Sequence, residues 1–322
     1  MKKSYKYTIC IMLAAVLVTA VPACSAENAV EKASVSVAPE NTPAAAPSCT
    51  ELTLADVSDY DVLDVDMLTS GTQEEIISDE YAALGIVRVC YESTGDKKIK
   101  LRVQKDENTI YYNLTAAGGI EVFPLQYGSG RYEVTVLENL YGDRYSVVTR
   151  KKFNAKIGDE NTVFLHSVQN IDWNTQKEAV QYVKMLISGI LNGAVDNERP
   201  DEACNGAVYD FTVNNITYDY DKLSDLVYNY LPDIDETFNT GRGICYDYAS
   251  LLAAMLRSIG IPAKLVKGYP DYMQDTYHAW NEVYIAGKWI VIDTTYDAVS
   301  DEQHPPAAMQ KDAGDYMKVY EY

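Results

Sequence analysis

The spacing of apolar residues changes once along the chain, near residue 172. Between residues 81 and 167, apolar and polar side chains alternate in short runs such as "GRYEVTVLEN", and clusters of Gly, Asn and Asp separate the runs. A period of two over such short segments is typical of half-buried antiparallel strands. Six to eight strands of this kind predict an all-β sandwich over residues 56–168.

Beyond residue 172 the apolar residues recur at helical spacing. Two amphipathic segments precede a third, which begins near Cys245 and ends at Gly260. Three extended runs come next, at residues 263–269, 277–285 and 288–295. Helices followed by antiparallel strands predict an α+β domain over residues 173–322, so the chain is expected to be multidomain.

The last two extended runs are joined by Ala286 and Gly287, a pair that favours a two-residue hairpin turn. With this turn, Trp280 lies opposite Asp293, and His278 is the diagonal neighbour of Asp293 on the same face. Diagonal neighbours lie about 5.5–8 Å apart, within reach of an imidazole–carboxylate hydrogen bond. The pattern therefore predicts a His278–Asp293 pair, which a shift of the register by one residue would separate.

Cys245 stands at the expected start of the third helix, directly after "TGRGI". The N–H groups and the dipole at a helix N-terminus favour a thiolate, and a nearby imidazolium favours it further. Gly241 and Gly243 allow a tight entry turn. Cys245 is therefore a candidate nucleophile for acyl transfer with His278 as its base, and a buried structural cysteine is the alternative. Backbone N–H groups at this helix start are candidates for binding an oxyanion, together with Asn239, for which turn capping is the alternative.

The stretch "GICYDYASLLAAMLRSIGIPAKLVKGY", with the later "YHAWNEVYI" and "KWIVIDTTYD", resembles the transglutaminase-like core superfamily over residues 205–298. The resemblance implies a papain-like cysteine proteinase fold, with Cys245 as nucleophile, His278 as general base and Asp293 as orienting carboxylate. From the residues alone, Asp297 is the alternative orienting carboxylate. The layout of the whole chain is also similar to exported bacterial proteins with an immunoglobulin-like sandwich ahead of a transglutaminase-like domain.

The resemblance leaves the reaction itself open. Water as the acyl acceptor gives a peptidase or deamidase, and a lysine amine gives protein crosslinking. We expect a thiol enzyme that acts on amide bonds of a protein or peptide, with no cofactor and no metal. The alternative is a catalytically silent binding or adhesion protein of the cell surface that has the same fold.

The N-terminal region has the features of a secretion signal. Three lysines lie within the first six residues, and a short apolar run follows, which predicts a signal peptide over residues 1–23. "VPAC" resembles a bacterial lipobox, so Cys24 is a candidate for lipidation and membrane anchoring, with ordinary cleavage and secretion as the alternative. Residues 24–55 are rich in Ala, Pro, Ser and Glu and predict a disordered tether.

The net charge and the spacing of the cysteines exclude some classes of binding partner. The formal net charge of −20 argues against nucleic acid or a bare anionic membrane as the main partner. The six cysteines lack C-x-x-C spacing, which argues against a zinc site. We therefore expect a protein or peptide substrate, and membrane contact only through a lipid on Cys24.

Overall fold

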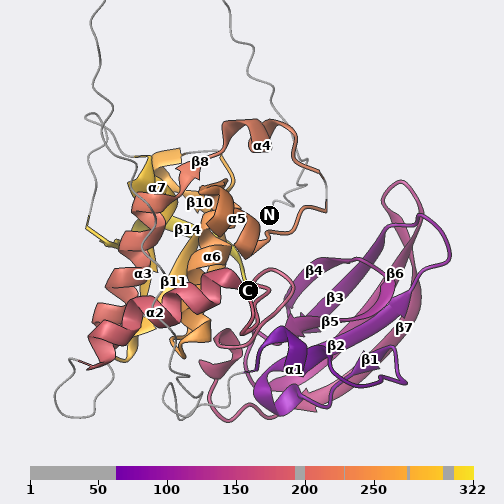
Figure 1. Cartoon of the computed structure of the whole chain (residues 1–322). Coiled ribbons are helices and arrows are strands. Elements are labelled where there is room, and N and C mark those ends of the chain that lie inside the picture. Colours follow the sequence, from indigo (N-terminus) through magenta and orange to yellow (C-terminus); the bar gives the residue numbers. More distant parts are fainter. Residues whose placement is uncertain (1–62, 193–199, 228, 274–275, 300–307) are drawn as a thin grey trace, which may run out of the picture. The chain divides into compact units, whose positions relative to one another are not determined.

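The computed structural model describes residues 63–192, 200–227, 229–273, 276–299 and 308–322 (Figure 1). The chain divides into two compact units, residues 1–50 and 51–322, and all described residues belong to the second. The predicted signal peptide, Cys24 and the tether over 24–55 lie outside the described residues. Among the described helices, none has the length and apolar composition that crossing a bilayer requires.

The alternating region forms two antiparallel sheets, as its period of two predicts. One sheet has the order β1 (Ile77–Ser78), β2 (Ile86–Glu92), β5 (Ala117–Pro124). The other has the order β4 (Asn108–Leu114), β3 (Ile99–Lys105), β6 (Gly130–Tyr141), β7 (Arg144–Ala155). Burial alternates along β3, where Ile99, Leu101 and Val103 are buried and the residues between them are only partly covered. A short helix, α1 (Val65–Thr69), precedes the first sheet.

Tyr132, at the start of β6, ties the connection between the two sheets to the core. Its hydroxyl lies 2.9 Å from the carbonyl oxygens of both Leu125 and Gly128, and it accepts the N–H of Tyr127 at 3.1 Å. Such a tyrosine corner is typical of immunoglobulin-like sandwiches. The assignment of this region to that fold, and the domain boundary near residue 170, stay predictions.

The second half of the chain combines helices with one five-stranded antiparallel sheet. The helices are α2 (Glu178–Asn192), α3 (Asp201–Asn215), α4 (Tyr220–Ser224), α5 (Ile234–Thr240), α6 (Cys245–Ser258) and α7 (Thr294–Ala298). The sheet has the order β13 (Gln310–Lys311), β12 (Lys288–Ile292), β11 (His278–Ile285), β10 (Ala263–Pro270), β14 (Tyr316–Glu321). A separate parallel pair joins β8 (Thr217–Tyr218) to β9 (Arg242–Gly243).

Helix α6 packs against strands β10 and β11 (Figure 1). All of its residues from Asp247 to Ser258 are buried, so the helix is part of the core except at its first two residues. The amide of Asn281 on β11 donates to the carbonyl oxygens of Ala249 on α6 at 2.8 Å and of Lys264 on β10 at 3.0 Å. These bonds fix the position of the helix along the strands.

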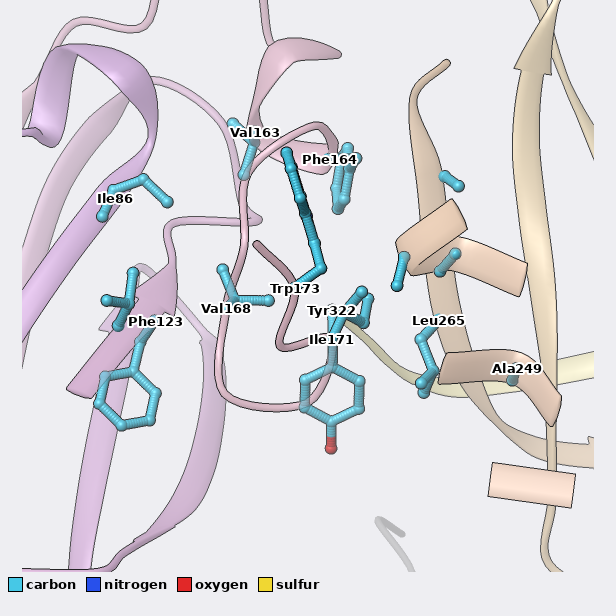
Figure 2. Close-up of a cluster of buried hydrophobic side chains, with 14 of the residues drawn as sticks. Ile86, Phe123, Val163, Phe164, Val168, Ile171, Trp173, Ala249, Leu265 and Tyr322 are labelled. Atoms are coloured by element: carbon cyan, nitrogen blue, oxygen red, sulfur yellow. The ribbon is translucent and has the colours of Figure 1, made fainter. Parts of the chain in front are cut away.

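The main hydrophobic core contains side chains from both N-terminal sheets, from residues 163–173, and from α6 and β10. Figure 2 shows part of it, with Phe123, Ile171 and Leu265 among the labelled side chains. Arg257 of α6 is fully buried beside this core, and its guanidinium donates to three main-chain carbonyl oxygens at 2.7–2.8 Å. The acceptors belong to Ala263, His166 and Tyr322.

Candidate active site

Cys245 is the first residue of α6, and a buried carboxylate holds the turn that leads into it. Asp247 accepts the N–H of Ile244 at 2.8 Å and lies 3.2 Å from the ammonium group of Lys222. Gly243 has no room for a side chain, because a Cβ there would lie 2.7 Å from the Cβ of Asp247. The predicted tight entry turn is therefore present, and it leaves Cys245 partly exposed.

The hairpin has the register that its turn predicts. Ala286 and Gly287 both have positive φ, 50° and 78°, as a two-residue turn of type I′ requires. Asn281 pairs with Ile292, which is the last residue of β12. Asp293 therefore lies one position beyond the ladder, where it is the N-cap of α7, but it still faces the start of β11.

The structure brings His278 and Asp293 together in a buried hydrogen-bonded pair. Nε2 of His278 lies 3.0 Å from Oδ2 and 3.2 Å from Oδ1 of Asp293. Three further donors reach the same carboxylate: the hydroxyl of Tyr272 at 2.6 Å, that of Tyr316 at 3.1 Å and the N–H of Tyr296 at 3.0 Å. A buried charge is tolerated when it is paired and fully hydrogen-bonded, which is the case here.

The pair sets the charge of His278. Burial by itself lowers the pKa of an imidazole, but the charge of Asp293 and hydrogen bonds with Asp293 and Cys245 raise the pKa of His278 to about 10. Burial raises the pKa of Asp293, yet the charge and hydrogen bond of His278 and the hydroxyl of Tyr272 bring it below its usual range. Because Nε2 faces Asp293, Nδ1 is the ring nitrogen left to interact with Cys245. The site thus holds an imidazolium next to a cysteine at a helix N-terminus.

Tyr218 is a further side chain at this site. It lies on β8, opposite Gly243 of β9, and that pairing carries it to the start of α6. Its hydroxyl interacts with the main chain of Cys245, and burial together with the charge of Cys245 raises the pKa of Tyr218, so that the hydroxyl keeps its proton. Sequence reasoning missed Tyr218, since one tyrosine among 27 carries no signal of its own.

Two other residues singled out from the sequence lie elsewhere. Asn239, the candidate oxyanion donor, is exposed on α5, and Tyr218 has the contact with Cys245 instead. Asp297, the alternative orienting carboxylate, is bound to Lys311 at 2.6 Å and to the hydroxyl of Tyr209 at 2.9 Å. Within the described ranges, no group of three His, Cys, Asp or Glu side chains is arranged to hold a metal ion.

The part of the chain that holds this site is similar in sequence to known proteins. Residues 189–294 match the sequence model of the transglutaminase-like superfamily. An uncharacterized protein of Mycobacterium leprae is 34% identical over 83 residues, which are 23% of this chain and 29% of that protein. A protein-glutamine gamma-glutamyltransferase of Pseudomonas aeruginosa is 36% identical over 93 residues, 25% of this chain and 14% of that protein. The matched part thus spans less than a third of either relative.

Among solved structures, LapG of Legionella pneumophila is similar with 15% sequence identity and a TM-score of 0.34. The superposition covers 47% of this chain and 77% of that one.

Proposed function

Because the chain contains a transglutaminase-like superfamily domain, we propose that it is a thiol enzyme that acts on amide bonds of proteins or peptides through a thioester at Cys245. The match over 189–294 confirms the resemblance predicted for residues 205–298. The observation that carries the proposal is the position of His278, which is hydrogen-bonded to Asp293 and close enough to Cys245 for the charge of Cys245 to raise its pKa.

The first step is the activation of the thiol. His278 already carries the proton as an imidazolium, and the thiolate of Cys245 beside it attacks the carbonyl carbon of a substrate amide, so that an S–C bond forms. The helix N-terminus and the imidazolium both favour the thiolate. Asp293 keeps the imidazole ring in the orientation that this step needs.

The attack places a negative charge on the carbonyl oxygen. We propose two donors for this charge, the N–H of Cys245 and the hydroxyl of Tyr218, which interact with each other. A substrate oxygen that lies between these two groups would accept a hydrogen bond from each. A single such donor contributes about 10²–10³-fold to the rate of acyl transfer in well-studied enzymes.

The second step releases the amine. His278 returns the proton to the leaving nitrogen as the C–N bond breaks, which leaves the acyl group on Cys245 as a thioester. An acceptor then attacks the thioester carbon while His278 takes its proton, and the Sγ–C bond breaks. With water as acceptor the result is hydrolysis or deamidation, and with a lysine amine it is a crosslink.

The test uses the purified full-length protein with an unfolded protein substrate and a fluorescent primary amine, with products resolved by mass. Incorporation of the amine into glutamine side chains would identify acyl transfer to amines, and cleaved or deamidated substrate would identify water as the acceptor. Either product should be abolished in Cys245→Ala and retained in Cys90→Ala, a matched change at the partly exposed cysteine of β2. Equal product from wild type and Cys245→Ala, or none from both, would contradict the proposal and favour a silent binding protein.

A further inference from the structure

One lysine lies beside the candidate nucleophile. Lys267 is on β10 opposite Ala279, next to Gly268, which pairs with His278. Lys267 is mostly covered but keeps some exposed surface, and its charge interacts with that of Cys245. A second cationic group therefore borders the site, and the chemistry proposed above does not use it.

The surroundings of this ammonium group are aromatic. Nζ of Lys267 lies 3.4 Å from the centre of the ring of Tyr246 and 5.2 Å from that of Tyr322. Tyr246 directly follows Cys245, so the ring under the ammonium group belongs to the first turn of α6. The rings stabilise the charge through their faces but accept none of its three N–H donors in the way an oxygen does.

Lys267 differs from the other well-covered lysines in its partners. Lys264 lies 3.0 Å from Glu321, and Lys311 lies 2.6 Å from Asp297. For Lys267, no ion pair and no hydrogen bond of the ammonium group is formed with any residue in the part of the chain that the structure describes. The protein has a net charge of −20, so carboxylates are plentiful. A lysine near the candidate nucleophile that pairs with none of them is therefore unusual.

Burial without a counter-ion has a measurable consequence for this amine. The groups that face Lys267 are Cys245, Tyr246 and Tyr322. Burial lowers the pKa of Lys267 to about 7, and only the charge of Cys245 opposes this. An anion that binds next to the ammonium group would restore its charge, which favours binding of an anionic ligand.

We propose that Lys267, with Tyr246 as its platform, forms a subsite for a substrate carboxylate next to Cys245. The inference rests on the proposed thiol chemistry and narrows its substrates to peptides or amides that carry a carboxylate within a few bonds of the reacting carbonyl. The two cations then have separate tasks: His278 serves the thiol, and Lys267 selects the acyl donor.

Two alkylating reagents of nearly the same size test this subsite. Iodoacetate carries a carboxylate and iodoacetamide a neutral amide, and both transfer their methylene carbon to Sγ with loss of iodide. The ratio of their second-order rate constants at Cys245 is measured in wild type, Lys267→Met and Lys267→Arg. Lys152→Met, which removes a half-exposed lysine of β7, is the matched control for the loss of one charge.

The subsite predicts that Lys267→Met lowers the ratio of the iodoacetate rate to the iodoacetamide rate by about tenfold, the usual range for loss of a charge-assisted contact. Lys267→Arg should retain most of the preference, and Lys152→Met all of it. An unchanged ratio in Lys267→Met would overturn the subsite. Equal slowing with both reagents would also overturn it, because Lys267 would then act on the thiolate and not on the carboxylate.

The same rate constants distinguish a failure of the proposed thiol chemistry from a failure of the subsite alone. If iodoacetamide labels Cys245 of the wild type no faster than Cys90, the thiol chemistry fails, and with it the subsite. If iodoacetamide labels Cys245 rapidly and only the iodoacetate preference is missing, the thiol chemistry stands and the subsite alone is contradicted.

Discussion

His166 and His278 are both almost fully buried, with 1% and 4% of their surfaces exposed, yet their environments drive them to opposite charge states. Burial and the charge of Arg257 lower the pKa of His166 to about 4. At His278 the charge and hydrogen bond of Asp293 outweigh burial and raise the pKa to about 10. At neutral pH the first ring is neutral and the second is a cation.

The difference shows what separates a structural histidine from a candidate catalytic one in this fold. His166 accepts the N–H of Leu63 at 3.2 Å through Nδ1 and joins segments distant in sequence. His278 instead faces a carboxylate, and the hydroxyls of Tyr272 and Tyr316 keep that carboxylate satisfied and charged. Burial alone favours the neutral ring, so the charge of His278 depends on the partners of Asp293.

The largest expected effect comes from Asp293→Asn. Without the carboxylate, burial is the main influence left, and the pKa of His278 should fall from about 10 to below the ordinary histidine value of 6.5. NMR titration of the imidazole signals measures this, and the signals of His166 in the same sample are the internal control. A pKa of His278 that stays near 10 in the variant would show that Asp293 is not its cause.

The same variant predicts a pH dependence of stability. A folded-state pKa above the unfolded value stabilises the fold fully below about pH 6.5, and this contribution is lost as the pH rises through about 10. The lowered pKa of Asp293 acts in the opposite sense, and its contribution is lost only in strong acid. The difference in melting temperature between wild type and Asp293→Asn should therefore be largest near pH 6 and shrink steadily as the pH rises toward 10. A difference that grows toward pH 10 would contradict this assignment.

A smaller effect is expected from the two tyrosines. Tyr272→Phe and Tyr316→Phe each remove one donor from Asp293 and leave the other three. A hydrogen bond to a charged group contributes about 1.5–3 kcal/mol, so each change should slow alkylation of Cys245 at neutral pH by about tenfold or more. Tyr111→Phe, at an exposed position of β4, is the control. Rates equal to wild type in both variants would mean that Asp293 does not need these donors.

The smallest effect on the site should come from His166→Phe. The change leaves the N–H of Leu63 without its acceptor, which costs about 1–3 kcal/mol of unfolding free energy. Thermal unfolding should register this loss, while the alkylation rate of Cys245 stays within about twofold of wild type, as is usual for substitutions away from a site. A large loss of Cys245 reactivity in the folded variant would remove the distinction between the two histidines.

Much of the site follows from the sequence because local rules decide it. Ala286 and Gly287 specify a tight turn, and counting back from that turn places His278 near Asp293 without any knowledge of the rest of the fold. Cys245 follows from the helical spacing of the apolar residues after it. The period of two likewise predicted six to eight strands in the N-terminal region, and its described residues form the seven strands β1 to β7.

The missing parts of the site come from elements that no local rule relates to the cysteine. Tyr316 lies on β14 and reaches Asp293 because β14 pairs with β10. Lys267 lies on β10, and its ammonium group reaches the rings of Tyr246 and Tyr322. Neither relation leaves a spacing pattern in the sequence. For Asn239, nearness in sequence was misleading. It is only six residues from Cys245 along the chain, but it lies at an exposed position of α5.

The most direct test of the account compares two cysteines of similar exposure, Cys90 and Cys245. Cys90 donates to the carbonyl oxygen of Gly118 at 3.3 Å on a strand, whereas Cys245 has His278 and a helix N-terminus. The protein is treated with iodoacetamide at pH 7, and the labelling of each cysteine is followed by mass spectrometry in wild type and His278→Ala. In the wild type, Cys245 should be labelled about 10²-fold faster than Cys90, and most of this difference in rate should be lost in His278→Ala. Equal rates for Cys90 and Cys245, or a Cys245 rate that does not depend on His278, would contradict it.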